Sequence, residues 1–144
     1  MNEATANAIL DAAHAAWSDG DLERMLSWYD DDLVYLANLG GPEGGPLRLE
    51  GKAALRAFLI PIIEVAESMS VTDSFQFANG VGRAQISCFL RHRTTGHVLS
   101  GTYRQRIIFK QDRVVQLEEF HDAAKVGAFW RLVNSEVDAP QPTR

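Results

Sequence analysis

The feature that most constrains the fold of this chain is a change of hydrophobic period near Ser70. Before that point apolar residues recur at helical spacing, whereas over residues 71–121 they alternate as in β-strands. Asn79-Gly80 separates two alternating runs, and Asn-Gly is the strongest short-range signal for a β-hairpin. Helices followed by a run of hairpins predict an α+β fold, with the helices packed on one face of the sheet.

Three helices are predicted in the first half of the chain. Residues 4–17 place apolar side chains at helical spacing, and a second helix covers Leu22–Tyr29 after a Ser-Asp-Gly-Asp break. Residues 51–68 carry a broad apolar stripe and predict a third helix. Pro61 lies inside this helix and should kink or split it, because proline removes one backbone hydrogen bond.

The segment between the second and third helices predicts a turn, a short strand and a loop. Asp30-Asp31-Asp32 are expected to form a solvated turn, since adjacent acids lack the alternating pattern of a calcium-binding loop. Residues 33–38 predict a strand, and the glycines and prolines of residues 39–46 predict a loop. That loop is not a phosphate loop, because Gly51-Lys52 continues into alanine rather than Ser or Thr.

The second half predicts an antiparallel meander of four strands, followed by a closing helix over residues 123–133. The strands are expected at residues 71–78, 81–92, 97–110 and 113–121. Residues 1–134 should form a single domain. Residues 135–144 contain two prolines and are expected to form a flexible tail.

Composition bears on which macromolecules the chain can bind and on where it is located. The 144 residues carry a formal net charge of −5 and no cluster of basic residues, so no nucleic-acid partner is expected. The apolar run near residues 57–66 is too short to cross a bilayer, and the N-terminus lacks a signal-peptide pattern. Cys88 is the single cysteine, which suits a reducing compartment. We therefore expect a cytoplasmic protein with no membrane partner.

The last predicted strand carries an unusual density of ionisable groups. Alternation places Glu119 and His121 on one face with Leu117, and Glu118 and Asp122 on the other. Neither face is purely apolar, so the period alone leaves open which set points inward.

The order of these segments resembles the nuclear transport factor 2-like superfamily, and in particular its SnoaL-like and ketosteroid-isomerase-like branch. The resemblance spans nearly the whole chain and rests on four stretches in the expected order. They are Trp17-Ser-Asp-Gly-Asp-Leu22, Tyr29-Asp-Asp-Asp-Leu-Val34, Gly51-Lys-Ala-Ala-Leu-Arg-Ala-Phe58 and Arg113-Val-Val…Glu119-Phe-His-Asp122. The resemblance implies a cone-shaped α+β barrel, in which three N-terminal helices pack on a curved mixed or antiparallel sheet around a hydrophobic pocket.

The resemblance also selects the inward face of the last strand. It implies that Leu117, Glu119 and His121 point into the pocket, with Tyr103 and Gln105 inward from the neighbouring strand. Gln105 and Glu119 share a face only if the hairpin at residues 111–112 has an odd loop length or a bulge. A slip of one residue in the register of strands 97–110 and 113–121 would turn the whole set outward.

The chain departs from ketosteroid isomerases at the residues that carry their chemistry. Ala37 or a neighbour stands where the resemblance implies the proton-shuttling aspartate, Ala13 where it implies a tyrosine, and Gln105 where it implies the second acid. Steroid isomerisation by that route is therefore not expected. SnoaL-like cyclases keep an acid on the last strand, and Glu119 occupies the matching position.

These considerations give a set of candidate site residues. Glu119 is the predicted catalytic carboxylate, with a pKa raised by an apolar pocket, and His121 orients it or serves as the acid. Tyr103 and Gln105 are predicted to stabilise an oxyanion. The remaining predicted substrate-binding residues are Trp17, Tyr35, Phe58 and Leu117.

Each candidate has a structural interpretation that the sequence leaves open. Glu119 would be an ordinary surface acid if it paired with Arg104 or Arg106, and His121 would then be half exposed. Tyr35 and Asn38 lie on opposite faces of a regular strand, so at most one of them lines the pocket.

The other three histidines, His14, His92 and His97, lie outside this set of candidate residues. His14 is expected to be exposed. His92 and His97 flank a hairpin turn without converging ligands, so no metal site is predicted there.

The leading hypothesis is a cofactor-free enzyme that acts on an apolar, oxygen-bearing small molecule by general acid–base chemistry, as an isomerase, cyclase or dehydratase. The alternative is a non-catalytic ligand-binding or dimeric scaffold module of the same fold. An epoxide hydrolase fits less well, because Arg104 and Arg106 have the wrong parity to face the pocket. A homodimer is expected through the outer face of the sheet, which would carry Arg83, Gln85, Ser87, Phe89, Arg104 and Arg106.

Overall fold

The computed structural model describes residues 1–40 and 45–138, and this part of the chain folds into four helices and six strands. In chain order they are α1 (Glu3–Ser18), α2 (Leu22–Leu26), β1 (Tyr29–Gly40), β2 (Pro46–Glu50), α3 (Lys52–Val65), β3 (Ala66–Ala78), β4 (Val81–His92), β5 (Val98–Lys110), β6 (Arg113–Phe120) and α4 (Ala123–Val137). None of the described helices is long and apolar enough to cross a membrane.

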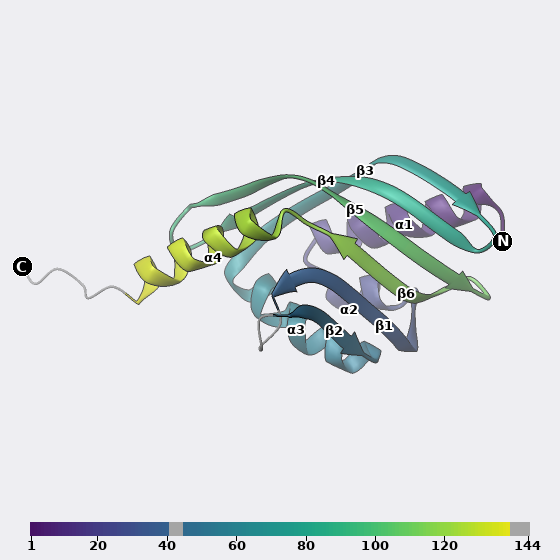
Figure 1. Cartoon of the computed structure of the whole chain (residues 1–144), viewed down its shortest axis with the longest axis horizontal. Helices are drawn as coiled ribbons and strands as arrows, with labels where there is room; N and C mark the ends of the chain where they lie inside the picture. The colour runs from purple at the N-terminus through teal and green to yellow at the C-terminus, as the bar shows by residue number, and fades with distance from the viewer. Residues whose placement is uncertain (41–44, 139–144) are drawn as a thin grey trace, which may run out of the picture.

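The six strands form one mixed sheet in the order β2-β1-β6-β5-β4-β3. All neighbours are antiparallel except β1 and β6, which run parallel. Figure 1 shows α1, α2 and α3 on the far side of the curved sheet, with α4 extending from one end of it. The predicted α+β class, with three N-terminal helices on a mixed sheet, is confirmed. The sheet does not close on itself, so the cone is open rather than a complete barrel.

The core lies between the inner face of the sheet and the first three helices. Small side chains on α1, including Ala6, Ala13 and Ala16, are almost fully buried and allow this helix to lie close to the sheet. Ile86 of β4 and Ile107 of β5 are buried opposite it. Burial of such apolar area supplies most of the stability of a domain of this size.

Side-chain caps begin three of the helices. Asn2 accepts a hydrogen bond from the backbone N–H of Thr5 at the start of α1. Asp21 and Asp122 cap α2 and α4 in the same way, through the backbone N–H groups of residues 24 and 125. Each cap satisfies a backbone donor that the helix leaves unpaired.

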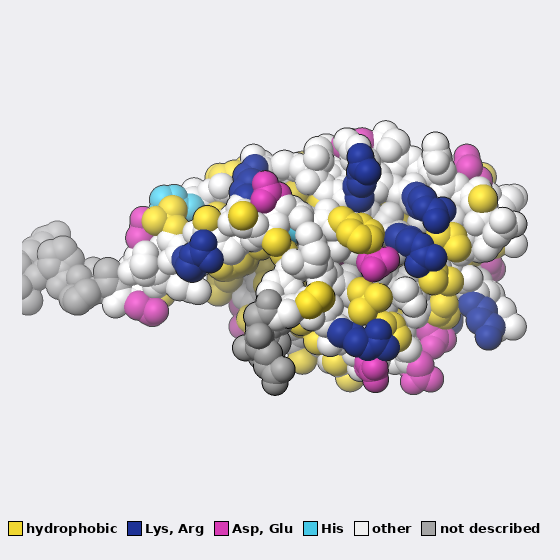
Figure 2. All heavy atoms as spheres, viewed as in Figure 1, with side chains coloured by type: hydrophobic (Ala, Val, Ile, Leu, Met, Phe, Trp, Pro, Cys, Tyr) yellow, Lys and Arg dark blue, Asp and Glu magenta, His cyan; other side chains and the backbone are white. Residues whose placement is uncertain are grey.

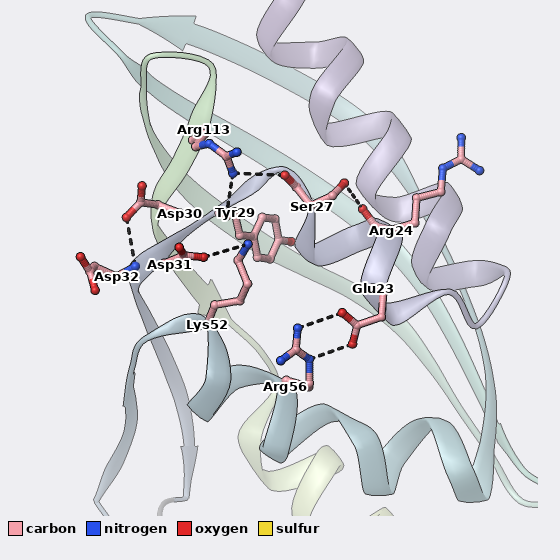
Figure 3. A network of polar contacts seen from close by, with 10 residues as sticks. All are labelled: Glu23, Arg24, Ser27, Tyr29, Asp30, Asp31, Asp32, Lys52, Arg56 and Arg113. Carbon is pink, nitrogen blue, oxygen red and sulfur yellow. Dashed lines mark hydrogen bonds and ion pairs between the residues drawn. The ribbon is translucent and has the colours of Figure 1, made fainter.

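Charged contacts fasten the start of β1 to the neighbouring elements (Figure 3). Arg56 of α3 forms two hydrogen bonds of 2.8 Å with the carboxylate of Glu23 on α2. Arg113 at the start of β6 donates to the backbone carbonyls of Ser27 and Tyr29 at 3.3 and 3.2 Å. The first contact joins α2 to α3, and the Arg113 contacts tie the start of β6 to the start of β1, which carries Tyr29.

Several predicted boundaries in the first half were wrong. The second helix ends at Leu26 rather than Tyr29, and Asp30–Asp32 belong to β1 instead of a turn. Strand β2 at Pro46–Glu50 was not predicted, because a strand of five residues in a Gly- and Pro-rich stretch shows little alternation. Residues 41–44 of the predicted loop lie outside the described residues.

The third helix was predicted three residues too long. It ends at Val65, and β3 begins at Ala66, because residues 66–70 pair with β4. This pairing shows tertiary contacts overriding a local helical pattern. Pro61 does not split the helix, which is continuous from Lys52.

The second half agrees closely with the predicted meander, since β4 coincides with its predicted range and β5 and β6 differ from theirs by one residue. Helix α4 continues to Val137, past the predicted start of the tail at Ser135. Residues 139–144 of that tail lie outside the described residues.

Candidate active site

The register between β5 and β6 decides which side chains meet inside the fold. Gln105 lies opposite Glu119, and Ile107 lies opposite Leu117. The two-residue turn at Gln111-Asp112 has positive φ at both positions, as in a type I′ hairpin. A two-residue turn alone would not place Gln105 and Glu119 on the same face. A bulge at Ile108/Phe109 shifts the register by one residue and brings these two residues opposite each other. The bulge that the inward assignment required is therefore present.

The inner face of the sheet and the helices enclose a cavity of about 1000 Å³. All eight predicted site residues line it, and they come from α1, β1, α3, β5, β6 and the residue that follows β6. These residues are Trp17, Tyr35, Phe58, Tyr103, Gln105, Leu117, Glu119 and His121. Of the two β1 residues that were considered, Tyr35 lines the cavity and Asn38 is exposed.

Glu119 is the hub of the polar groups in this cavity. Tyr35 donates its hydroxyl proton to Oε1 at 2.6 Å, and the side-chain amide of Gln105 donates to Oε2 at 2.7 Å. The Nε2 atom of His121 lies 3.1 Å from Oε1. Only 12% of the Glu119 side chain is exposed. A buried carboxylate with this many donors is stabilised in its charged form.

The predicted direction of the Glu119 pKa was wrong. Burial pushes this pKa upward, but the hydrogen bond and the charge of His121, together with the hydrogen bonds from Tyr35 and Gln105, outweigh burial and hold the pKa below 4.5. The prediction considered only the apolar walls around the carboxylate and missed its donors. Glu119 is therefore an ionised carboxylate at neutral pH rather than a proton-carrying acid.

His121 is held in place on several sides. Its ring stacks on the ring of Tyr103, with centroids 4.3 Å apart and planes at 20°. The side chain of Asn38 holds its backbone, donating to the carbonyl at 2.7 Å and accepting from the N–H at 2.8 Å. Because Glu119 is ionised and can only accept, Nε2 carries a proton, and Nδ1 has no protein partner among the described residues.

Two tyrosines point hydroxyl groups into the cavity that form no hydrogen bond with described protein groups. Tyr29 and Tyr103 line the cavity, and neither hydroxyl bonds to a side chain or backbone group in the described part of the chain. Burial, followed by the charge of Glu119, raises the pKa of both phenols well above the usual value. Both hydroxyls therefore stay protonated as hydrogen-bond donors. Tyr29 was missed because it was assigned to the end of the second helix.

Gln105 does not offer its amide to the cavity as predicted. Its NH₂ group donates to Glu119, and its carbonyl oxygen lies 3.0 Å from Nε2 of His14. Both ends of the amide are occupied by protein groups. The bond to Glu119 uses one N–H of Gln105, so the predicted oxyanion-stabilising role of Gln105 would depend on its second N–H.

His14 was predicted to be exposed and is instead buried, with 8% of the residue accessible. Its Nδ1 atom lies 2.6 Å from the hydroxyl of Ser70 on β3. Burial lowers the pKa of this imidazole, against the opposing effects of Gln105, Glu119 and Asp11. Positions 10, 13, 14 and 17 lie on one face of a helix, and the other three carry Leu10, Ala13 and Trp17. This spacing is the sequence signal that could have predicted a buried His14.

No group of three or more His, Cys, Asp or Glu side chains within residues 1–40 and 45–138 is arranged to hold a metal ion. The cavity lining in the same part of the chain includes two acids, Glu119 and Asp122, and no arginine. Asp122 is engaged as the cap of α4. The chemistry that these side chains offer is proton transfer and hydrogen bonding.

Comparison with known proteins decides the family. The sequence model for the SnoaL-like domain matches residues 10–122. The chain belongs to the SnoaL-like family. This assignment agrees with the nuclear transport factor 2-like fold described above. No curated protein matches this SnoaL-like chain in sequence.

Solved structures agree on the fold of this SnoaL-like domain. A Bacillus subtilis protein with a provisional isomerase name has a TM-score of 0.79 at 21% identity, covering 91% of this chain and 96% of its own. TerC, co-crystallised with polyporic acid, has a TM-score of 0.71 at 20% identity, with coverage of 91% and 98%. An LEH-like epoxide hydrolase from M. tuberculosis has a TM-score of 0.71 at 13% identity, with coverage of 94% and 96%. At these identities the likeness shows a shared fold and leaves the reaction open.

Proposed function

We propose that this SnoaL-like domain is an enzyme that moves a proton on a small, largely apolar molecule bearing a carbonyl, enol or phenol oxygen. Isomerisation, cyclisation and dehydration are the reaction types that such a proton transfer serves. The observation that carries the proposal is the Glu119–His121 pair inside a cavity of about 1000 Å³. A cavity of this size accommodates a drug-sized molecule.

In the proposed mechanism His121 is the proton carrier. Its Nδ1 atom accepts a proton from a C–H or O–H group of the substrate and later returns it, while Nε2–H stays bonded to Glu119. Glu119 holds the ring orientation and offsets the positive charge that develops on the imidazole. The lowered pKa of Glu119 favours His121 as the base and Glu119 as its counter-charge, because a carboxylate with a low pKa is a weak base that stays ionised.

Tyr29 and Tyr103 are the proposed donors to the substrate oxygen. Loss of a proton next to a carbonyl places negative charge on that oxygen, and a phenol that stays protonated stabilises it by donating a hydrogen bond. A ligand oxygen would also satisfy two hydroxyls that have no protein partner among the described residues. This pairing favours a substrate whose oxygen accepts hydrogen bonds over one that only donates them.

The aromatic walls of the cavity favour a substrate with a flat apolar body. Trp17, Phe58 and Trp130 line it, and such rings bury large apolar areas. TerC, a structural neighbour, was crystallised with polyporic acid. Another neighbour is named as an epoxide hydrolase, but the described lining here has no arginine to hold an epoxide oxygen, which argues against that reaction.

The proposal can be tested without the natural substrate by using 5-nitrobenzisoxazole. A base removes its ring C–H proton, the N–O bond breaks to give a nitrile, and the released phenolate absorbs visible light. We expect His121→Gln to reduce kcat/KM by about 100-fold, a usual contribution of general base catalysis. His97→Gln is the matched control, because His97 lies outside the cavity lining and pairs with Glu136. Wild-type and His121→Gln proteins with equal rates and intact folds would overturn the proposal.

A second candidate function is ligand binding without chemistry. It is favoured by one observation, namely that the acceptor oxygens of Glu119 are already occupied by protein donors. A thermal-shift screen with polycyclic phenols and quinones separates the two functions. Stabilisation by such a compound, with no chemical change to it and no reaction of 5-nitrobenzisoxazole, supports the binding module and contradicts the enzyme.

A further inference from the structure

The polar contacts of Glu119 continue along the cavity wall toward β3, the edge strand of the sheet. Gln105 of β5 bonds to Glu119 at 2.7 Å, and His14 of α1 bonds to Gln105 at 3.0 Å. His14 in turn bonds to the hydroxyl of Ser70 on β3 at 2.6 Å. Side chains from four elements, α1, β3, β5 and β6, therefore meet in one row.

The chemistry of the first member fixes the direction of every hydrogen bond in the row. An ionised Glu119 can only accept, so the NH₂ group of Gln105 must face it. The carbonyl oxygen of Gln105 then faces His14, so Nε2 of His14 must carry the proton. The neutral ring leaves Nδ1 as an acceptor, and the hydroxyl of Ser70 donates to it.

We propose that His14 is a positioning residue for the catalytic pair, acting through Gln105. By donating to the amide oxygen of Gln105, it holds the amide NH₂ group against Glu119 and keeps that carboxylate ionised beside His121. The catalytic meaning of this role rests on the function proposed above, whereas the positioning itself rests on the hydrogen bonds.

The alternative orientation of Gln105 shows why such a residue is needed. A flipped amide would bring its carbonyl oxygen to the carboxylate, where two acceptors repel, and would leave the NH₂ group facing the imidazole. His14 is the one donor to the Gln105 oxygen among the described residues, so it adds to the repulsion from the Glu119 carboxylate in opposing the flip. Buried polar groups in such rows depend strongly on one another.

The far end of the row is anchored to the backbone. The hydroxyl of Ser18 accepts from the backbone N–H of Ser70 at 3.0 Å, which ties the end of α1 to β3. His14 lies one helical turn before Ser18, so this contact also holds the ring of His14 at a fixed depth. Burial lowers the pKa of His14, in agreement with the neutral ring that the row requires.

The tautomer of His14 in the wild-type protein is the first test, and it needs no variant to fold. Nitrogen-15 NMR distinguishes a protonated ring nitrogen from an acceptor nitrogen. We expect a neutral ring at pH 7, with the proton on Nε2. A proton on Nδ1, or a doubly protonated ring at that pH, would overturn the proposal.

The second test measures the pKa of Glu119 by carbon-13 NMR in five proteins, namely the wild type, three single variants and one double variant. His14→Phe removes the donor to Gln105 and should raise the Glu119 pKa by about one pH unit, as expected when a carboxylate loses one hydrogen bond. His14→Gln offers an amide that can both donate and accept, and should restore the wild-type value. In a Gln105→Leu background, His14→Phe should cause no further rise.

Two outcomes of this cycle would overturn the proposal. One is an unchanged Glu119 pKa in a folded His14→Phe protein. The other is an equal rise with and without Gln105, which would mean that His14 acts on Glu119 directly. These results are separate from turnover of 5-nitrobenzisoxazole, so an inactive protein with the expected pKa changes would refute the enzyme and keep the positioning role.

Discussion

Glu118 and Glu119 are adjacent in the sequence and lie in different environments. Glu119 points into the cavity and accepts hydrogen bonds from Tyr35 and Gln105, whereas Glu118 lies on the outer face opposite Arg106 of β5. Both residues are glutamates in the same strand, so neither residue type nor neighbouring sequence distinguishes them. The bulge between β5 and β6 sets the parity that sends one acid inward and the other outward.

The outer face of the sheet differs from the inner face over its whole length. Figure 2 shows basic side chains spread over it, with apolar side chains between them. Met69, Val71 and Phe120 are 59%, 53% and 46% exposed on β3 and β6. The inner face is instead covered by helices, and it carries the hydrogen-bonded groups around Glu119. The inner face therefore bounds the cavity, whereas the outer face carries exposed apolar side chains among charged ones.

The two glutamates provide the largest expected contrast. Glu119→Gln removes the counter-charge of His121 and places an amide N–H against donors, so kcat/KM for 5-nitrobenzisoxazole should fall about 100-fold. Glu118→Gln should change that rate by less than about twofold, because surface substitutions distant from a site have small effects. Similar losses in both variants would remove the functional distinction between the two faces.

A second contrast concerns stability and uses the adjacent residues Ile107 and Ile108. Ile107 is 1% exposed on the inner face, and Ile108 lies half-buried on the outer face. Ile107→Ala should lower the free energy of unfolding by about 3 kcal/mol, and Ile108→Ala by about 1 kcal/mol. Urea denaturation measures both values. A larger loss for Ile108→Ala would contradict the assigned register.

The pH dependence of stability should reflect two inward groups. The folded-state pKa of His14 lies below 6.5, so the unfolded chain binds this proton first as the pH falls. The contribution of His14 is complete above pH 6.5 and is lost on acidification below that value. Glu119, with a folded-state pKa below 4.5, adds a further loss below pH 4.5.

His14→Gln should therefore flatten the fall in unfolding free energy just below pH 6.5, and Glu119→Gln should flatten it below pH 4.5. Chemical denaturation at a series of pH values measures both slopes. A His14→Gln protein that loses stability as steeply as the wild type between these two values would show that another group is responsible.

The smallest expected effect on the site comes from the outer face. We propose that the protein forms a homodimer through this face, and Phe120→Glu should weaken it by adding charge to an exposed apolar position. Light scattering at micromolar concentration should show a dimer for the wild type and more monomer for the variant. The rate with 5-nitrobenzisoxazole should stay within about twofold of the wild type. A wild-type monomer at that concentration would contradict the proposal.

The sequence predicted the fold through features that depend on local chemistry. Asn79-Gly80 and Gln111-Asp112 mark two of the hairpin turns, and positive φ accounts for the choice of Asn79, Gly80 and Asp112. The three-helix start followed by strands fixed the α+β class. The inward set of Leu117, Glu119 and His121 needed the family resemblance, because alternation alone gave two equal faces.

The sequence did not predict how the inward polar groups combine. His14, Gln105 and Glu119 are on three elements, and only the folded chain shows that their side chains form one row. The wrong direction for the Glu119 pKa followed from this gap, since desolvation was foreseen and the donors were not. Strand β2 was missed because its Gly- and Pro-rich stretch shows little alternation, and the early start of β3 was missed because pairing with β4 overrides a local helical pattern.

The central claim is that Glu119 is a buried but ionised carboxylate that serves His121 as a counter-charge. Its most direct test is a carbon-13 NMR titration of the Glu119 carboxyl in the wild-type protein, assigned with the Glu119→Gln variant. The account predicts a pKa below 4.5. A pKa at or above that value would contradict it, because the carboxyl would then be governed by its apolar walls rather than by its hydrogen-bond donors.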